Sequence, residues 1–411
     1  TVAILAQALQ PSVSSSAAHV CTSPLRTAPC GSRVPHTQMQ LLSKMPFTSS
    51  GALATATALT AFTVAGTYLM RLMGKVGDQN ITCLFSLLLR YGKVDFLTFM
   101  QKHREAVQRG QEASDYVPGV CHYYSLMSDV ITLTSGPFWH FVPMVRGLSR
   151  QDCHHRFHHT LTRYLEARDN DRILEIGCGF GEMGRQVAQI SGASVTGLTM
   201  ADVEVEEGAK RIEAAGLKGR CDMVQGNYHK TPFEAESFDK VFGIYTLKYS
   251  ADLDGAIKEA ARLLKPGGKF LSYEILVTDK YKPDDKLQKY YVDQISSSTC
   301  MPPLWHARAF RDAAKKAGLV AAEEDDLCGA GSGAGQWYSC FERTGIHAVL
   351  SSSLLLRLVQ ASESIRLLPA GFSDWFESCA VHPATDFVNA GRLGIVSGAV
   401  MMTWKKPLRS A

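Results

Sequence analysis

From about residue 150 onward, the chain alternates between two patterns of apolar and polar positions. Short apolar runs predict strands, at 172–176, 194–198, 221–225, 240–245 and 269–275. Apolar positions three or four residues apart predict helices, at 152–168, from 182 onward, at 203–215 and at 253–264. Strands and helices follow one another in turn, which predicts an α/β fold with a doubly wound, mostly parallel sheet covered by helices on both faces.

The segments on either side of this region show weaker patterns. Residues 80–112 combine an apolar run with a charged stretch and predict a helix or a helix pair that leads into the core. The turn Lys265-Pro266-Gly267-Gly268 ends a helix and starts a strand, because proline stops the helix and glycine allows the reversal. Near the C-terminus, residues 348–359 and 365–368 are mostly apolar, and 392–404 predicts a further strand.

The first 75 residues have a different composition. Residues 1–44 are rich in Ser, Ala, Thr, Pro and Gln, as in a disordered leader or targeting segment. Residues 45–70 contain no charged side chain, and Arg71 and Lys75 follow at once, so the segment is long enough to cross a bilayer. We predict a membrane anchor at 45–75 with the catalytic part in the cytoplasm. A flexible leader or a transit peptide is the alternative.

Composition and charge narrow the possible classes of protein. The chain has 411 residues, of which 45% are hydrophobic, and this predicts a globular protein with a sizeable core. A net charge of +4 without a run of Lys or Arg argues against a nucleic-acid partner. The eleven cysteines are scattered, without paired C-x-x-C knots, so neither a disulfide framework nor a structural zinc knot is expected.

Four histidines, His154, His155, His158 and His159, form the densest histidine cluster of the sequence. Positions four apart share one helix face, which is a possible spacing for metal ligands. No H-E-x-x-H pattern accompanies them. We therefore expect a solvated, partly basic helix surface and no metal.

The predicted strand at 172–176 runs directly into three glycines, Gly177, Gly179 and Gly181. Glycines at such a strand end let backbone N–H groups approach a nucleoside-bearing cofactor, with the next helix N-terminus facing the same ligand. Dinucleotide binders continue as G-x-G-x-x-G, whereas this chain has Glu182 at the third glycine position. The spacing therefore favours S-adenosylmethionine over NAD. An ordinary strand-to-helix turn is the alternative.

From about residue 120 to the C-terminus, the chain resembles the sterol methyltransferase family. The resemblance is carried by Tyr123-Tyr124 with Asp129, Gly136, His140 and Phe141, by the glycine loop, by residues 191–198, by the Lys-Pro-Gly-Gly turn, and by Tyr273-Glu274 with Thr278-Asp279-Lys280-Tyr281. The Tyr-Tyr and Thr-Asp-Lys-Tyr segments are the most particular to sterol enzymes. The resemblance implies the class I fold of S-adenosylmethionine-dependent methyltransferases.

Within that family, three segments resemble the nematode-type sterol 4-methyltransferases, namely 245–249, 367–372 and 391–395. The enzymes that methylate side-chain carbon C24 carry an aromatic and acidic run where this chain has residues 130–135, and a glutamate where it has Tyr245. Ring C4 is therefore the expected site of methylation, with C24 as the alternative. Another small acceptor, or a non-catalytic sterol-binding protein, stays open.

The resemblance also implies roles for the cofactor residues. Glu175 would lie near the cationic end of the cofactor, or would only cap the next helix. Thr199 ends the second strand where an acid usually meets the ribose, so hydroxyl or backbone contacts would replace it. Asn227 would contact adenine and Tyr228 would pack on its ring. The full expected set is Glu175, Gly177, Cys178, Gly179, Gly181, Thr199, Asn227, Tyr228 and Tyr245.

The two possible reactions need different catalytic groups. Methylation at C24 passes through a carbocation, whereas methylation at C4 needs a carbanion-like carbon such as the enol of a 3-keto sterol. A base and an oxyanion donor are then required. The candidates are Tyr124 and His140 as donors, and Asp129 and Glu274 as bases. The apolar C-terminal residues would line a sterol pocket or pack in the core.

The expected organisation follows from these readings. It comprises a leader (1–44), a membrane anchor (45–75), a helical substrate-side lead-in (76–150), an S-adenosylmethionine-binding domain (151–340) and a C-terminal sterol methyltransferase region (341–411). We expect a sterol substrate and association with a membrane, at the endoplasmic reticulum. Plastid or mitochondrial targeting by the leader is the alternative location.

Overall fold

The computed structural model describes residues 94–135, 138–329, 332, 334–343 and 346–409. The predicted leader and membrane anchor lie outside these residues. Seven strands form one sheet: β1 (Arg172–Ile176), β2 (Ser194–Thr199), β3 (Cys221–Gln225), β4 (Phe238–Ile244), β5 (Leu264–Val277), β6 (Val320–Asp326) and β7 (Val396–Lys405). In the described part of the chain, no helix is both long enough and apolar enough to cross a membrane.

The helices between and around these strands have the following bounds. The first half holds α4 (Phe96–Ala113), α5 (Val117–Ser135), α6 (Arg150–Leu165), α7 (Glu182–Ser191), α8 (Asp202–Ala214), the 3-10 turn η2 (Leu247–Tyr249) and α9 (Leu253–Leu263). The second half holds α10 (Lys286–Ser298), α11 (Ala307–Lys316), α12 (Ser339–Arg343), α13 (Ile346–Leu350), α14 (Ser353–Ser364), α15 (Phe372–Trp375), the π-helical η3 (Phe376–Val381) and α16 (His382–Leu393).

The sheet order is β3-β2-β1-β4-β5-β7-β6. The first five strands of this order pair in parallel, and β7 runs antiparallel to both of its neighbours. The strand order reverses between β1 and β4, where the carboxyl ends of an α/β sheet open a crevice for ligands. The predicted doubly wound, mostly parallel sheet is confirmed.

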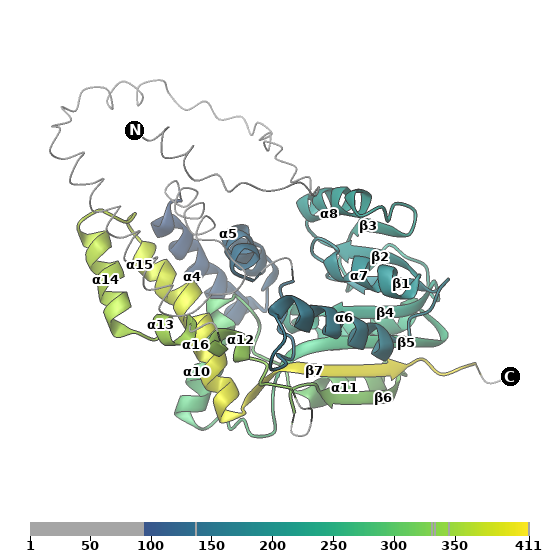
Figure 1. Ribbon diagram of the computed structural model, residues 1–411. Helices are drawn as coiled ribbons and strands as arrows, with labels where there is room; N and C mark the ends of the chain where they lie inside the picture. Colours follow the sequence, from purple (N-terminus) through teal and green to yellow (C-terminus); the bar gives the residue numbers. More distant parts are fainter. Residues whose placement is uncertain (1–93, 136–137, 330–331, 333, 344–345, 410–411) are drawn as a thin grey trace. The chain divides into compact units, whose positions relative to one another are not determined.

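Helices cover both faces of the sheet (Figure 1). One face packs Phe157 of α6 and Val187 of α7 into a buried cluster. The other face packs Ile257 of α9 and Phe310 of α11. Such two-sided cover is required because the strands of a parallel sheet are apolar on both faces. Burial of these rows is the main source of stability for the fold.

A helical layer lies beyond one end of the strands, where α4, α5 and α15 meet (Figure 1). Its core contains Phe96, Tyr123 and Trp375, which belong to three separate segments of the chain. The ring of Phe96 lies 5.2 Å from that of Trp375. This packing places α5 at the carboxyl ends of the parallel strands, as the contacts of Tyr124 below show.

Several predicted boundaries differ from the structure by one residue or more, and two of the differences have a clear local cause. Helix α6 begins at Arg150, two residues before the predicted start, because Ser149 and Asp152 form a capping box in which each side chain accepts from the other backbone N–H. Strand β5 begins at Leu264 and includes the predicted turn. The turn forms a bulge within this strand, because Leu264 pairs with Phe238 of β4 and the next paired residue is Lys269, opposite Lys240.

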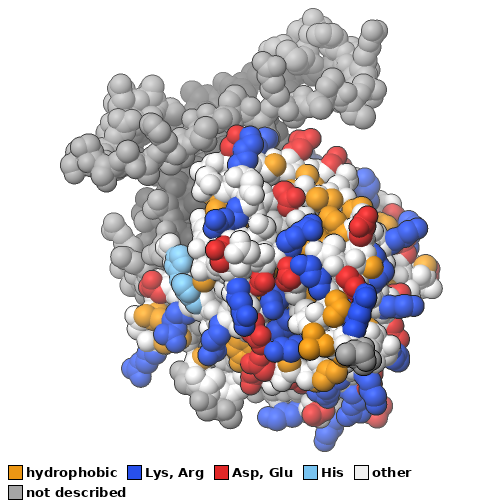
Figure 2. Space-filling view, turned by 90° about the vertical axis from the view of Figure 1, so that its right-hand side faces the viewer, with side chains coloured by type: hydrophobic (Ala, Val, Ile, Leu, Met, Phe, Trp, Pro, Cys, Tyr) orange, Lys and Arg blue, Asp and Glu red, His pale blue; other side chains and the backbone are white. Residues whose placement is uncertain are grey.

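The predicted C-terminal region (341–411) contributes a strand to the sheet of the predicted cofactor-binding domain. Strand β7 comes from the C-terminal region and pairs with β5 on one side and β6 on the other. The last strand of the chain is therefore part of the sheet that carries the glycine loop. On the face shown in Figure 2, Lys and Arg side chains are interspersed with Asp and Glu.

The prediction of a solvated histidine surface on α6 is wrong for two of the four side chains. His155 and His159 are exposed, whereas His154 and His158 are only 4% and 1% exposed. The reason is the helix period, since both buried histidines share a face with Phe157 and Leu161, which packs onto the sheet.

Candidate functional site

The glycine loop joins the end of β1 to the start of α7. Gly177, Gly179 and Gly181 have φ angles of +62°, +53° and +69°, which glycine adopts without strain. A Cβ added at Gly177 would lie 2.4 Å from Cγ2 of Thr246, whereas one at Gly179 would meet nothing within 4 Å. The loop is thus closely packed against the residues after β4 at its first glycine and open at its second.

Glu175 lies within β1, directly before this loop. Its Oε2 accepts a hydrogen bond of 2.7 Å from the N–H of Gly184, in the first turn of α7, and the side chain is 4% exposed. Burial raises the pKa of this carboxyl group to about 8. The structure therefore shows the helix-capping contact, and the contact with the cationic end of the cofactor stays a prediction.

Thr199, at the end of β2, hydrogen-bonds to a carboxylate that the sequence analysis missed. Its hydroxyl donates to Oε2 of Glu204, in the first turn of α8. Burial raises the pKa of Glu204. Burial, then the charges of Glu175 and Glu204, raise the pKa of the Cys178 thiol, which places Glu204 near the glycine loop. An acid thus stands beside the expected ribose position, supplied by the helix instead of the strand.

No sequence signal singles out Glu204, because Asp202, Glu206 and Glu207 lie in the same two turns of α8. Only the fold shows which acid faces the loop.

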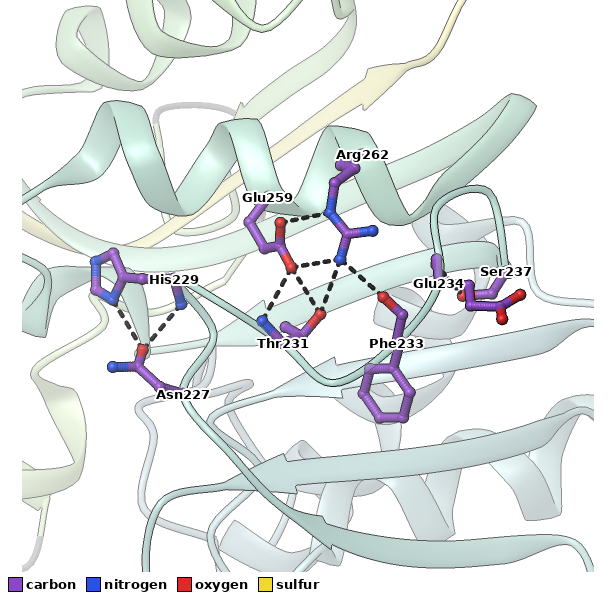
Figure 3. A network of polar contacts seen from close by, with 8 residues as sticks. All are labelled: Asn227, His229, Thr231, Phe233, Glu234, Ser237, Glu259 and Arg262. Atoms are coloured by element: carbon purple, nitrogen blue, oxygen red, sulfur yellow. Dashed lines mark hydrogen bonds and ion pairs between the residues drawn. The ribbon is translucent and has the colours of Figure 1, made fainter.

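Asn227 and Tyr228 follow β3, on the loop shown in Figure 3. Oδ1 of Asn227 accepts from the backbone N–H of His229 at 2.9 Å and lies 3.0 Å from Nδ1 of the same residue. The oxygen expected to contact adenine is therefore already bonded to His229. Asn227 is exposed, and its contact with adenine stays a prediction.

The same loop is held against α9 by a polar network (Figure 3). Oε1 of Glu259 accepts from the backbone N–H and the hydroxyl of Thr231, at 3.0 and 2.7 Å. Arg262 donates to Glu259 and to the carbonyl of Phe233. These bonds give the loop after β3 a defined position at the edge of the crevice.

Tyr228 links this loop to the acceptor side of the site. Its ring packs beside that of His229, with centroids 4.5 Å apart. Burial, and after it the charge of Glu274, raise the pKa of its hydroxyl. The contact of Tyr228 with the adenine ring stays a prediction.

Glu274, in β5, is fully buried. Its Oε1 accepts from the backbone N–H of Leu247 at 2.9 Å and from the Ser272 hydroxyl at 3.0 Å. Its Oε2 is buried and has no hydrogen-bond partner among the described residues. Burial raises the pKa of this carboxyl group. A buried carboxylate with one oxygen unoccupied has the form expected of a general base.

Lys248, in η2, is 7% exposed and was not among the predicted site residues. Its Nζ lies 4.8 Å from the ring centroid of Tyr245 and 4.7 Å from that of Tyr249. Burial lowers the pKa of Lys248, and the neighbouring Glu274 opposes that shift. Within residues 245–249 the sequence predicted a role for Tyr245 alone, although a lysine between tyrosines was the available signal for Lys248.

Tyr124 of α5 lies over these groups. Its hydroxyl is 2.6 Å from that of Tyr249, and burial raises its pKa to about 12. Its ring stacks on Trp139 at a centroid distance of 5.5 Å, and Trp139 meets the edge of Phe180 in the glycine loop at 5.7 Å. The structure therefore brings the predicted residues Tyr124 and Glu274 to the same end of the sheet as the glycine loop.

Two further predicted residues take other positions. The hydroxyl of Tyr245 donates to the carbonyl of Gly398 and accepts from the N–H of Phe141 at 3.3 Å, so it is already saturated. Tyr245 has a φ of +53°, a strained angle for a tyrosine, and its ring stacks on Tyr273. Its contact with the cofactor stays a prediction, and its ring lies against the Nζ of Lys248.

His140 is not brought together with Glu274. Its ring packs near Tyr273 and the buried histidines of α6. Successive residues of a strand face opposite sides of a sheet, so Tyr273 and Glu274 point to different faces. The role of His140 as a donor stays a prediction, and among the described residues its ring contacts lie on the face of the sheet opposite Glu274. Asp129 belongs to α5, but its side chain lies outside the described part of the chain.

Two family segments meet away from Glu274. The Thr278 hydroxyl donates to the carbonyl of Gly394 at 2.6 Å, and the N–H of Thr278 donates to that of Ile395 at 3.0 Å. They line a cleft of about 600 Å³ together with Trp337. The observed role of Thr278 is to join the end of β5 to the start of β7.

The arrangement fits a nucleoside-bearing methyl donor. The loop backbone is open at Gly179, the N-terminus of α7 follows, and Glu204 stands at the end of β2. Glu175, Thr199, Glu204 and Asn227 would hold the cofactor, with the groups around Glu274 beyond it. A donor and an acceptor can therefore be aligned at the carboxyl ends of the strands.

We expect Gly177→Ala to weaken binding of S-adenosylhomocysteine at least about tenfold, equal to about 1.4 kcal/mol. The added methyl group would collide with Thr246, and φ of +62° is unfavourable for alanine. Calorimetric titration measures the loss. The matched control is Gly216→Ala, which has φ of +69° but no atom within 4 Å of the new Cβ. Equal loss in both variants would show that backbone strain alone is responsible.

We expect Glu204→Gln to weaken the same binding about 10- to 100-fold, the range for hydrogen bonds to a charged group. Glu206→Gln, an exposed neighbour on α8, is the control and should bind normally. If Glu204 acts on the ribose, the variant and the wild type should bind a 2′,3′-dideoxy analogue of the ligand equally. A persistent difference with that analogue would contradict the assignment.

Comparisons with known proteins agree with this geometry. A family model described as "Methyltransferase domain" matches residues 174–272. The sterol 4-C-methyltransferase strm-1 of Caenorhabditis elegans is 32% identical over 322 residues, 78% of this chain and 96% of the relative. The cycloartenol-C-24-methyltransferase 1 of Oryza sativa subsp. japonica is 30% identical over 72% of this chain and 87% of the relative.

Solved structures confirm the fold alone. A geranyl diphosphate C-methyltransferase from Streptomyces coelicolor superposes with a TM-score of 0.55 at 16% identity, covering 72% of this chain and 98% of that chain. The [4+2]-cyclase SpnF has a TM-score of 0.51 at 20% identity, covering 69% and 94%.

The predicted cofactor, S-adenosylmethionine, is supported by the methyltransferase family model and by the glycine loop that binds it in this fold. The sequence relationship extends well beyond that domain, over nearly the full length of a relative that is 32% identical. The chain belongs to the S-adenosylmethionine-dependent sterol methyltransferase family.

Proposed function

We propose that the protein transfers the methyl group of S-adenosylmethionine to ring carbon C4 of a 3-keto sterol. The observation that carries the proposal is the buried Glu274 with its unoccupied Oε2, next to Lys248 and at the same end of the sheet as the glycine loop. The similarity to a sterol 4-C-methyltransferase from C. elegans supports this choice of substrate.

The cofactor supplies a methyl group on a positively charged sulfur. The residues of this chain make the acceptor carbon nucleophilic. Oε2 of Glu274 takes the proton from C4, and the electron pair of the C–H bond moves toward the 3-keto oxygen, which becomes negative. The ammonium of Lys248 is placed to stabilise that oxygen. Tyr124 and Tyr249, joined by their hydroxyls, enclose the site and exclude water.

Methylation of the side chain at C24 is the second candidate, because the rice C24 enzyme is also similar to this chain. A C24 carbocation would need aromatic faces free to stabilise it. The rings of Tyr245 and Tyr249 face the Nζ of Lys248 instead. This contact favours the C4 reaction.

The test is incubation of the full chain with methyl-labelled S-adenosylmethionine and either a 3-keto sterol or a Δ24 sterol. The expected result is label at C4 of the keto sterol, located by mass spectrometry and NMR. Label on the side chain of the Δ24 sterol would replace the C4 proposal by the C24 reaction. No label on either sterol would overturn both.

We also propose that the protein works at a membrane surface, through α14. Leu354 and Leu358 are 65% and 55% exposed, one helical turn apart, and no residue of α14 is buried. Arg357 is exposed beside them. An apolar helix face flanked by a basic residue can lie in the lipid interface, where sterols are dissolved. The expectation that these apolar residues line an enclosed pocket is not supported by their exposure.

We expect Leu354→Ser with Leu358→Ser to lower activity on vesicle-embedded sterol several-fold, with little change on sterol delivered by cyclodextrin. The control is Val203→Ser, at a side chain that is 62% exposed on α8. Equal activity of variant and control on vesicles would contradict the role of α14. The cyclodextrin assay keeps this test separate from that of the reaction itself.

A further inference from the structure

Three buried histidines from two segments converge on one face of the sheet. His140 lies between α5 and α6, and His154 and His158 lie one turn apart on α6. They are 7%, 4% and 1% exposed, and one ring nitrogen from each lies within 4.8 Å of the others. Neither the reaction nor the cofactor uses them.

Five of the six ring nitrogens are buried without a hydrogen-bond partner among the described residues. These are Nε2 of His140 and both nitrogens of His154 and of His158. Burial lowers the pKa of His158, and Gln186 of α7 opposes that shift. Each buried polar group without a partner costs roughly 1–3 kcal/mol. Three such side chains in one place therefore indicate a missing ligand.

The surroundings exclude bulk water. The ring of Phe138 lies 5.1 Å from that of His154 and 4.5 Å from that of His158, and Phe157 lies 4.9 Å from His140. Burial lowers the pKa of all three histidines, to about 3 for His154 and about 4 for His158. Metal ions bind the neutral form of imidazole, through a ring nitrogen such as those left without a hydrogen bond here.

We propose that His140, His154 and His158 bind one divalent transition-metal ion, with Zn²⁺ the best match. Imidazole ligands select Zn²⁺ and its neighbours over Mg²⁺ and Ca²⁺, which prefer oxygen. Zinc–nitrogen bonds of about 2.0–2.1 Å place tetrahedral ligand atoms about 3.4 Å apart, so ring movements of about 1 Å complete the site. Ring rotations of that size need no change of the backbone.

The fourth ligand would be water, hydroxide or another small anion, as in other three-histidine sites. Arg150 lies close enough to lower the pKa of His140 and of His154 further, after burial. A guanidinium there opposes a bare cation and favours an anionic fourth ligand. No carboxylate of the described residues contributes to the cluster.

The ion would have a structural role that bears on the site. One neighbour of His140 contacts the site directly, because Trp139 stacks on Tyr124. The other neighbour is tied to β5, because the carbonyl of Phe141 accepts from the Tyr273 hydroxyl at 3.0 Å. A metal bound to His140 and to α6 would hold residues 138–141 against the sheet. The ion would thereby position Trp139, which stacks on Tyr124, without itself contacting the substrate.

The test starts from the full chain produced without a histidine tag. Elemental analysis by mass spectrometry should find about one zinc ion per chain after dialysis. His154→Gln and His158→Gln should each lose most of it. The controls are His155→Gln and His159→Gln, exposed on the same helix, which should keep it. Binding of S-adenosylhomocysteine checks that each variant is folded.

A second measurement does not depend on variants. Cobalt(II) added to the metal-free wild type should give the intense visible absorption of tetrahedral coordination, and zinc should displace it stoichiometrically. Removal of the metal should also lower the melting temperature. Zinc retained in His154→Gln and His158→Gln, or a cobalt spectrum identical to that of the aqueous ion, would overturn the proposal.

Discussion

Glu274→Gln is expected to lower kcat for methyl transfer by about 10²- to 10⁴-fold, the usual contribution of a general base. Glutamine keeps the acceptor for the Leu247 N–H but cannot take a proton at the second position. Binding of S-adenosylhomocysteine should stay within about twofold, because the contacts expected with the cofactor lie on other residues. Initial rates with a 3-keto sterol, together with calorimetry, measure both effects.

The pH profile distinguishes a base from a merely structural acid. Burial raises the pKa of Glu274 above the ordinary glutamate range, so the carboxylate needed for the reaction is lost as pH falls through that raised value. Burial lowers the pKa of Lys248, so its ammonium is lost as pH rises through a value below 10.5. We therefore expect the rate of methyl transfer to show a bell-shaped dependence on pH. Glu274→Gln should remove the loss of rate at low pH, and Lys248→Met should remove the loss of rate at high pH.

Proton exchange isolates the first step. With S-adenosylhomocysteine bound and the solvent replaced by D₂O, the wild type should introduce deuterium at C4 of a 3-keto sterol without methyl transfer. Glu274→Gln should not. Ser272→Ala is the matched control, because it removes one hydrogen bond to Glu274 and leaves the carboxylate. Undiminished exchange in Glu274→Gln would show that another group is the base.

Lys269→Ala is expected to lower the free energy of unfolding by about 3 kcal/mol. Lys269 is fully buried, and its Nζ lies 3.0 Å from Glu166 and 2.9 Å from Glu323. The variant loses the packing of the buried alkyl stem and the cation that pairs with Glu323, whereas Glu166 keeps its pair with Lys405. Denaturant unfolding followed by circular dichroism measures the change.

Two further variants show whether the destabilisation comes from the loss of a buried side chain or from the loss of an ion pair. Lys405 pairs with the same Glu166 at 3.0 Å but is 48% exposed, so Lys405→Ala should cost only about 0.5 kcal/mol. Lys269→Met keeps the apolar volume and should cost much less than Lys269→Ala. A cost for Lys405→Ala equal to that for Lys269→Ala would contradict the importance of burial.

The acid dependence of stability follows from the same cluster. Glu166 has its pKa lowered from 4.5 to about 2, chiefly by the hydrogen bond from Lys269. A lowered carboxyl pKa stabilises the folded state fully above pH 4.5, and this stabilisation is lost as pH falls toward 2. Lys269→Ala should therefore flatten the loss of stability over that interval.

The sequence by itself determined the elements that depend on neighbouring residues. Apolar periods located β1 and β3 at their observed bounds, and the spacing of Gly177, Gly179 and Gly181 identified the cofactor loop. The predicted starts of α7 and α9 also agree with the structure, whereas α6 begins two residues early because Ser149 and Asp152 form a cap before its apolar period. A strand pattern, the spacing of a loop and the motifs of a family each involve residues that are close together in the sequence, so they can be recognised without the structure.

Only the tertiary structure decided which distant side chains meet. Glu274 and Leu247 are 27 residues apart, and Lys269 lies 103 residues from Glu166. The insertion of β7 between β5 and β6, the approach of Glu204 to the glycine loop, and the burial of His154 and His158 all depend on packing between elements. The apolar period of a helix shows that the helix has a buried face. Which element packs on that face, and so which functional side chains meet there, is decided by how the elements pack in the fold.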